Sequence, residues 1–241
     1  MPKQAPKKFL PRGVRILFED ADLLIIEKPC GLLSVPARYE PDRNALTLMT
    51  HFIRKGQSKS RKELFAVNRL DRETSGILVF AKSLSLREHM HDDWNAVKKT
   101  YLAVLAGKLP NDEGLLESYL RQDENYRVRS VKNPQEGKLA QTRYRVLARG
   151  NNWTCVCAEL ITGRKNQIRV QFSEIEHAVL GDKMYGHVRA ERLALHAWKI
   201  AFPHPRTGKL IELESPPPPF FSAYENNASH TGKTKPETEC E

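Results

Sequence analysis

Several features that would identify common classes of protein are missing from this chain of 241 residues. No apolar run approaches the length of about 20 residues that crosses a bilayer, and the basic N-terminus lacks the apolar stretch of a secretory signal. The four cysteines lack the paired spacing of a metal site. Glycine-rich phosphate loops, zinc-ligand spacings and nucleophile elbows are also lacking. We therefore expect no membrane span, no metal and no cofactor, and reduced thiols in a cytoplasmic protein.

Positive charge, in contrast, is in excess. The formal net charge is +10 and the isoelectric point is near 9.5. Such a charge favours a polyanionic partner, although it can also serve solubility alone. Residues 1–13 are basic and proline-rich, and we interpret them as a flexible arm that touches phosphates. Residues 226–241 are polar and expected to be disordered, which leaves residues 14–225 for one folded domain.

Periodicity along this domain predicts both strands and helices. Apolar, β-branched runs predict strands at residues 14–18, 23–27, 98–107, 141–147 and 153–161. Helical spacing predicts helices near residues 44–54, 84–97 and 165–176, with Asn44 as the N-cap of the first. Alternation over residues 126–131 places Tyr126, Val128 and Ser130 on one face, which suits a solvated or RNA-facing edge hairpin.

The most informative segment runs from Asn68 to Ala81. Its charged first part leads into the apolar run 77–81, which is typical of a strand buried on both faces. A loop that carries Arg69, Asp71 and Arg72 at the end of a buried strand can hold a site rigidly. The same charges are also compatible with a solvated turn in which they pair with one another.

The sequence Arg-Leu-Asp-Arg-Glu-Thr-Ser-Gly of residues 69–76 resembles the signature loop of the RluA family of RNA pseudouridine synthases. In that family the aspartate of the loop is catalytic, so the resemblance implies this role for Asp71. The family usually has histidine where this chain has Asn68. The resemblance includes residues 16–36 and extends from residue 14 to about residue 215.

A second segment, residues 162–171, is similar to another run of the same family. There the second arginine pairs with the catalytic aspartate, which implies that Arg169 pairs with Asp71. Asn166 and Gln171 stand where histidines are usual. Without the resemblance, Arg169 and its basic neighbours would read as a basic helix start at the surface.

Tyr101 lies in a Lys-Thr-Tyr-Leu-Ala pattern that also resembles the family, whose tyrosine lines the active site against the target base. A tyrosine ring can stack on a flipped-out uracil. Without the resemblance, Tyr101 would be a half-buried strand residue. The resemblance further implies that Arg69 fills the gap left by the flipped nucleotide. We expect three more cations to contact RNA, namely Arg72, Arg164 and Lys165.

We therefore expect an α+β fold: a single pseudouridine synthase catalytic domain with a mixed, largely antiparallel sheet around a basic cleft. The expected activity is the isomerisation of a specific uridine in a structured stem-loop of ribosomal or transfer RNA, by a monomer. The alternative is a catalytically inactive RNA-binding protein with the same fold, which the departures at Asn68, Asn166 and Gln171 motivate. A hydrolase that uses Asp71 on a nucleoside is a third possibility.

Overall fold

The structure is a computed structural model that describes residues 10–57 and 59–226. Most of the expected N-terminal arm and of the expected C-terminal tail lies outside these described residues. The chain divides into two compact units. Unit 1 comprises the described residues up to Val97 together with Lys199–Ser215, and unit 2 comprises Lys98–Trp198 together with the described residues from Pro216 onward.

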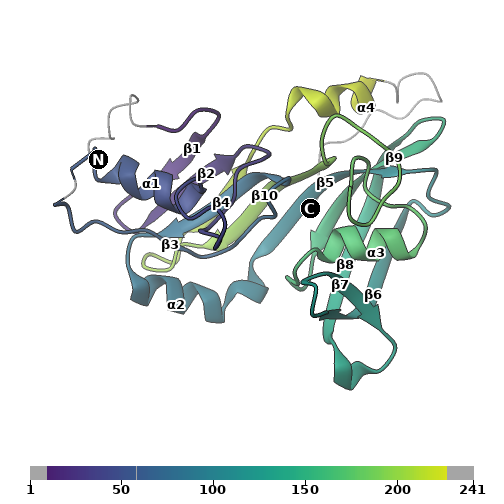
Figure 1. Ribbon diagram of the computed structural model, residues 1–241, viewed down its shortest axis with the longest axis horizontal. Helices are drawn as coiled ribbons and strands as arrows, with labels where there is room; N and C mark the ends of the chain where they lie inside the picture. Colours follow the sequence, from purple (N-terminus) through teal and green to yellow (C-terminus); the bar gives the residue numbers. More distant parts are fainter. Residues whose placement is uncertain (1–9, 58, 227–241) are drawn as a thin grey trace. The chain divides into compact units, whose positions relative to one another are not determined.

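Unit 1 combines short helices with antiparallel strands (Figure 1). Its elements are β1 (Arg15–Glu19), β2 (Leu23–Lys28), α1 (Ala45–Ile53), β3 (Phe65–Ala66), β4 (Ser75–Ala81), α2 (Leu84–Asp92), the 3-10 helix η2 (Trp94–Ala96), the second part of β10 (Leu195–Pro203) and β11 (Leu210–Glu214). The expected hairpin of β1 and β2 is confirmed. Strand β4 pairs antiparallel with both β2 and β3, and β10 pairs antiparallel with β11.

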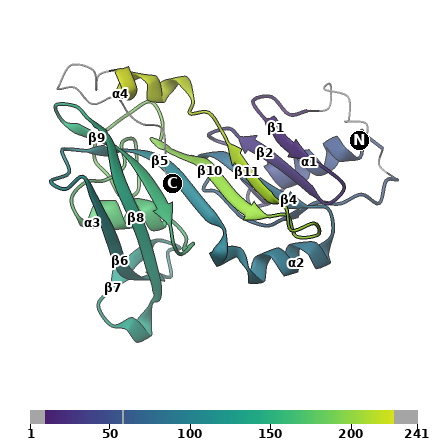
Figure 2. The ribbon, with the colours of Figure 1, turned by 180° about the vertical axis from the view of Figure 1, so that it is seen from behind.

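Strand β4 is the centre of unit 1, and all seven of its residues are buried. This confirms the buried strand expected from the apolar run. Alternate residues of β2 and β4, such as Leu23 and Val79, share one core cluster with Met90 of α2. Helix α1 lies in front of the strands of unit 1 in Figure 1 and behind them in Figure 2. The strands are therefore shielded from water by helical residues as well as by each other.

Unit 2 is built on a five-stranded antiparallel arrangement in the order β5-β9-β8-β6-β7. Its elements are β5 (Lys98–Ala106), β6 (Glu113–Gln122), β7 (Val128–Val131), the 3-10 helix η3 (Pro134–Glu136), β8 (Lys138–Arg149), β9 (Trp153–Leu160), α3 (Gln167–Glu174), the first part of β10, the 3-10 helix η4 (Pro219–Phe221) and α4 (Ser222–Asn226). Helix α3 packs on β6, β7 and β8. Its Phe172 meets Tyr144 edge-on, with ring centroids 5.6 Å apart.

Two of the three expected helices differ from expectation at their ends, and the expected cap of the first is confirmed. Asn44 accepts a hydrogen bond from the backbone of Thr47. Helix α2 ends at Asp92, because Trp94 turns to pack on Phe202 with ring centroids 6.3 Å apart. Helix α3 begins only at Gln167, because the preceding Asn166 has a left-handed backbone with φ 54°.

The sequence-based expectation for residues 126–131 is wrong in part. Strand β7 begins at Val128, and Tyr126 lies in the turn between β6 and β7 with φ 60°. The fold class itself is confirmed, since the strands pair mainly antiparallel and Leu33 and Asn44 form a parallel bridge. The expected basic cleft stays a prediction. Among the described residues, none of the helices is long and apolar enough to cross a membrane.

Candidate active site

The loop of residues 68–76 carries Asp71 and leads directly into β4. Ser34 fixes this loop from outside, because its hydroxyl donates to the carbonyl of Leu70 at 2.7 Å and accepts from the Leu70 N–H at 2.9 Å. Within the loop the N–H of Thr74 donates to the carbonyl of Asp71 at 3.1 Å. Asp71 itself is half-buried. The backbone on both sides of Asp71 is therefore held in place.

Lys28 is a second anchor of the same loop. Its ammonium group is fully buried and donates to three carbonyl oxygens, those of Pro29, Leu32 and Arg72, at 3.0, 2.7 and 3.2 Å. The carbonyl of Arg72 also accepts from the N–H of Gly31 at 2.9 Å. Gly31 has φ 84°, a conformation that glycine adopts without strain. A buried cation thus ties the residue after Asp71 to the end of β2.

Asn68, where the family usually has histidine, has a structural role at the start of the loop. Its side-chain oxygen accepts from the N–H of Val79 at 2.8 Å, and its amide donates to the carbonyl of Ile77 at 3.4 Å. Asn68 therefore continues the pairing to β4 after β3 has ended. The departure from the usual histidine leaves the loop anchored.

The two arginines of the loop differ in their surroundings. Both are exposed. Arg72 bonds to the carbonyl of Gly31 through Nε at 3.1 Å and pairs with Glu40 through Nη1 at 3.1 Å. Its guanidinium thus already supports the loop. The role of Arg69, which is exposed, stays a prediction.

Tyr101 and Lys99 lie two residues apart on β5, so their side chains leave the strand on the same face. Tyr101 is half-buried, pairs across from Ala158 and packs against the core of unit 2. Lys99 is 6 % exposed. Burial lowers the pKa of Lys99 from its ordinary value of 10.5 to about 8. A lysine with a depressed pKa beside the expected active-site tyrosine was not among the residues expected from the sequence.

Arg169 of α3 forms a two-point ion pair with Asp182. Its Nε and Nη2 atoms donate to the two carboxylate oxygens at 2.7 and 2.9 Å. The side chain of Arg169 is 12 % exposed and that of Asp182 is fully buried. Nη1 of Arg169 donates to the side-chain oxygen of Asn166 at 3.2 Å, and its guanidinium lies 5.1 Å from the ring centre of Tyr185. These contacts fix the orientation of the guanidinium.

Asp182 is in turn held by the turn in which it lies. One of its oxygens accepts from the N–H groups of Met184 and Tyr185, at 2.9 and 3.0 Å. Burial alone would raise the pKa of Asp182, but the hydrogen bonds and charge of Arg169 and the two N–H groups outweigh it and lower this pKa. Gly181 precedes it with φ 74°, and a Cβ there would lie 2.1 Å from the Arg192 carbonyl oxygen. Only glycine fits this position.

Three further residues of the segment 162–171 differ in their exposure and in their hydrogen bonds. Arg164 is half-buried and donates through Nε to the carbonyl of Leu139 at 2.9 Å. Lys165 is exposed and donates to the carbonyl of Tyr126 at 3.2 Å. Gln171 is buried, accepts from the Thr142 hydroxyl at 2.6 Å and donates to the Ala140 carbonyl at 3.0 Å. Gln171 therefore joins α3 to β8.

The expected site residues fall into both units. Asp71, Arg69 and Arg72 belong to unit 1, whereas Tyr101, Arg164, Lys165 and Arg169 belong to unit 2. The pairing of Asp71 with Arg169 stays a prediction. Sequence reasoning missed Lys28, Lys99 and Asp182. Asp182 had a signal, since the Gly-Asp-Lys-Met-Tyr-Gly run of residues 181–186 reads as a tight turn.

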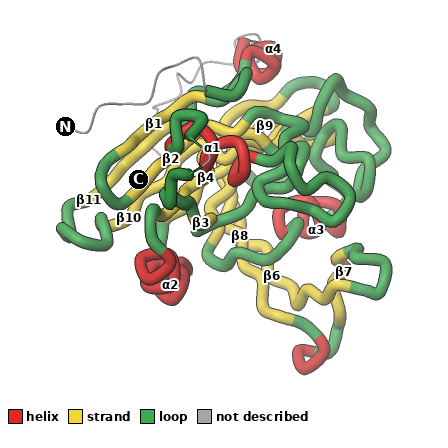
Figure 3. Tube along the Cα trace, turned by 60° about the vertical axis from the view of Figure 1, so that its left-hand side comes forward, coloured by secondary structure: helices red, strands yellow, loops and turns green. Residues whose placement is uncertain are grey.

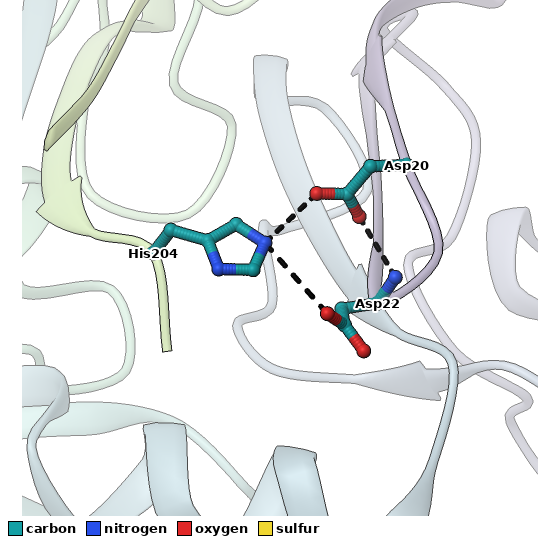
Figure 4. Close-up of side chains that lie close together, drawn as sticks. All are labelled: Asp20, Asp22 and His204. Carbon is teal, nitrogen blue, oxygen red and sulfur yellow. Dashed lines mark hydrogen bonds and ion pairs between the residues drawn. The ribbon is translucent and has the colours of Figure 1, made fainter. Parts of the chain in front are cut away.

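The described residues also contain one group of side chains with the composition of a metal site, Asp20, Asp22 and His204 (Figure 4). Nδ1 of His204 accepts from the backbone N–H groups of Arg206 and Thr207, so Nε2 carries the hydrogen that it donates to Asp20 at 2.8 Å. The Arg206 guanidinium occupies both oxygens of Asp22. The atoms that could bind a metal ion are thus already engaged in hydrogen bonds. These bonds join the turn between β1 and β2 to the turn between β10 and β11.

Comparisons with known proteins identify the family of this chain. A family model described as RNA pseudouridylate synthase matches residues 22–174, which include parts of both units. Ribosomal large subunit pseudouridine synthase D of Nitrosomonas europaea is 34% identical over 92% of this chain and 68% of its own length. Dual-specificity RNA pseudouridine synthase RluA of Yersinia pestis is 34% identical over 80% of this chain and 94% of its own length.

Solved structures show the same fold. Human RNA pseudouridylate synthase domain containing 4 superposes with a TM-score of 0.72 at 22% identity, over 89% of this chain and 92% of that chain. Human RNA pseudouridylate synthase domain containing 1 gives a TM-score of 0.68 at 23% identity, over 87% and 86% of the two chains. By sequence and by fold, this chain belongs to the RNA pseudouridine synthase family, with relatives of the RluA and RluD type.

Proposed function

We propose that this chain isomerises one uridine of ribosomal or transfer RNA to pseudouridine, with Asp71 as the catalytic carboxylate. The observation that best supports this proposal is the anchoring of the loop around Asp71. Lys28 and Ser34 hold the residues on either side of it, and the loop joins a fully buried strand. A carboxylate that must act on one carbon atom needs such a rigid support.

The isomerisation of uridine to pseudouridine requires no oxidation and no transfer of a group to another molecule. The bond between N1 of uracil and C1′ of ribose breaks, the base turns, and a bond between C5 and C1′ forms. The proton on C5 leaves and N1 gains one, so that the atoms of substrate and product are the same. Asp71 can serve as a nucleophile toward the sugar or the base, or as the base that removes the C5 proton.

Arg169 is proposed to orient the Asp71 carboxylate. The contacts with Asp182 and Asn166 hold its guanidinium in one orientation. A guanidinium held in this way can form charge-assisted hydrogen bonds to the Asp71 carboxylate. Tyr101 is proposed to pack against the target uracil, in line with its half-buried place on β5.

RNA is the substrate class that the basic charge of the chain suits. We assign Arg69 to the gap left by the flipped nucleotide. Three more cations, Arg72, Arg164 and Lys165, are assigned to the RNA-contacting surface. Arg72 and Arg164 also donate hydrogen bonds to carbonyl groups of the protein itself. The catalytically inactive alternative gains no support, because Asn68, Asn166 and Gln171 each have hydrogen-bonding roles in their own unit.

Mapping pseudouridines across the ribosomal and transfer RNA of a strain that lacks this protein tests the proposal. We expect at least one site to be lost in that strain and restored by the wild-type chain, but not by Asp71→Asn. The absence of any lost site, or restoration by Asp71→Asn, would contradict the proposal.

A further inference from the structure

Tyr126 is an exposed aromatic residue in a backbone conformation that tyrosine rarely adopts. It lies in the loop that joins β6 to β7, which Figure 3 shows in green at the end of the hairpin. Its side chain is 75% exposed and its φ is 60°. Left-handed backbone is unfavourable for a bulky residue, and large aromatic side chains usually bury most of their area. Folding of unit 2 alone gives no reason for a tyrosine here.

The turn nevertheless holds Tyr126 in one place. Its N–H donates to the carbonyl of Asp123 at 3.0 Å, and its own carbonyl accepts from Nζ of Lys165 at 3.2 Å. The carbonyl of the next residue, Arg127, accepts from the N–H of Asp123 at 2.8 Å, and the N–H of Arg127 donates to the side chain of Asp123 at 2.9 Å. The exposed ring is therefore presented on a defined support. Strained conformations kept by several contacts are frequent at functional sites.

One exposed cation lies against the ring, and a second exposed cation is the next residue of the chain. Nζ of Lys165 lies 5.9 Å from the ring centre of Tyr126. The Arg127 guanidinium lies 5.3 Å from the ring centre of Tyr185 and donates to the carbonyl of Met184 at 2.6 Å. Of the acidic neighbours, Asp123 pairs with Arg129 at 3.3 Å and Glu124 is exposed. Tyr126, Arg127 and Lys165 together form what we call the turn surface.

The turn surface is connected to Arg169 through a short chain of contacts. Lys165 is followed by Asn166, which donates to the hydroxyl of Tyr185 at 3.0 Å and accepts from Nη1 of Arg169 at 3.2 Å. The Tyr185 hydroxyl also accepts from the N–H of Val128, at the start of β7. The arginine proposed to act in catalysis and the exposed ring therefore share one set of supports within unit 2.

We propose that the turn surface binds a single-stranded nucleotide of the RNA substrate, whose base stacks on the ring of Tyr126 while Lys165 and Arg127 face its phosphates. This inference rests on the proposed function and adds a subsite to it. Every base has a π face, so an exposed ring stacks on RNA without sequence preference. A cation on one side of the ring and an open face on the other suit a base between protein and solvent.

The test compares two probes of equal length and charge, an oligouridylate and an abasic ribose-phosphate oligomer. The wild-type chain is expected to bind the oligouridylate between about fivefold and a hundredfold more tightly, because only this probe can stack. Tyr126→Gly removes the ring and relieves the left-handed backbone, so it should fold normally and lose the part of this preference that stacking on Tyr126 contributes, about fivefold or more. Tyr126→Phe keeps the ring and should keep the preference.

Two further variants separate the contributions. Lys165→Met should weaken the binding of both probes by the same factor. The slope of log affinity against log salt concentration should fall by about the contribution of one phosphate contact. Leu210→Ala, which alters an exposed apolar residue of β11, should change neither affinity. If Tyr126→Gly keeps the wild-type preference for the oligouridylate, the subsite does not exist.

The proposed function is tested separately, by pseudouridine formation in ribosomal and transfer RNA. A wild-type chain that forms pseudouridine but binds both probes equally would overturn the subsite alone. A wild-type chain that forms none and binds neither probe would overturn the subsite and the proposed function together.

Discussion

Arg169 and Asp182 form a two-point ion pair in unit 2, with N–O distances of 2.7 and 2.9 Å. The aspartate is fully buried and also accepts two backbone N–H groups of its own turn. The guanidinium is therefore oriented by the protein before substrate binds. Such an orientation suits the role that we propose for Arg169, in which it meets a second carboxylate.

Asp182→Asn should lower both turnover and stability. Asparagine can still accept hydrogen bonds, but it removes the negative charge that faces a buried guanidinium. We expect the free energy of unfolding to fall by roughly 3 kcal/mol, and turnover to fall by more than the Michaelis constant rises. Denaturant unfolding and steady-state kinetics measure the two effects. An unchanged turnover number would show that Asp182 does not position Arg169 for the reaction.

Asp112→Asn is the matched control, because Asp112 pairs with Arg149 at an exposed site. It should lower stability by less than about 1 kcal/mol. The pH dependence gives a second check. The pKa of Asp182 is lowered, so its contribution to stability is complete above its ordinary value of 3.8 and is lost as the pH falls through the folded-state pKa. The stability difference between wild type and Asp182→Asn should therefore shrink in strong acid.

Lys28→Met should loosen the loop that carries Asp71. Methionine fills a similar space but removes the donor that the carbonyl oxygens of Pro29, Leu32 and Arg72 share. The Arg72 oxygen keeps its bond from the N–H of Gly31. We expect a loss of roughly 3 kcal/mol in the free energy of unfolding. Hydrogen exchange at the amides of Gly31 and Thr74 should accelerate, and turnover should fall, because the loop no longer holds Asp71 in one position.

Lys82→Met is the control for this variant. Lys82 pairs with Glu19 and donates to the carbonyl of Asp20, so its loss also destabilises unit 1, but it does not contact the loop. Exchange at Gly31 and Thr74 and turnover under stable conditions should stay at wild-type levels. Equal effects of the two variants on exchange would mean that Lys28 acts only on global stability.

Lys99 should make stability rise with pH in the alkaline range. Its pKa is about 8 in the folded chain and 10.5 ordinarily, so the unfolded chain binds more protons between these values. Stability should therefore increase as the pH rises from about 8 to about 10.5. Lys99→Met removes this contribution, and the difference between the two pH profiles isolates it from other groups. Parallel profiles would mean that Lys99 has an ordinary pKa in the folded chain.

The parts of the fold that the sequence predicted are those set by local pattern. The cap at Asn44 depends on residues three positions apart, and β4 depends on one unbroken apolar run. The resemblance of residues 69–76 and 162–171 to a known family pointed to the family that the comparisons then showed.

What the sequence did not reveal depends on contacts between distant residues. Lys28 and Arg72 are 44 positions apart, and Lys165 and Tyr126 are 39 apart. Asp182 meets Arg169 because a left-handed glycine and a tight turn bring it to α3. Tyr126 continues the alternating pattern of residues 128–131 in the sequence, but the hydrogen bond from its N–H to the carbonyl of Asp123 places it in a turn. Periodicity carries no information on such tertiary contacts.

Release of tritium from RNA labelled at C5 of uridine tests the central claim most directly, because isomerisation frees the hydrogen at this carbon. The purified wild-type chain, Asp71→Asn and the control Glu73→Gln, which alters the neighbouring exposed carboxylate, are compared on RNA from the strain that lacks the protein. We predict release by wild type and Glu73→Gln, and none by Asp71→Asn, although this variant keeps its RNA affinity and melting temperature. Release at the wild-type rate by Asp71→Asn would contradict the role of Asp71.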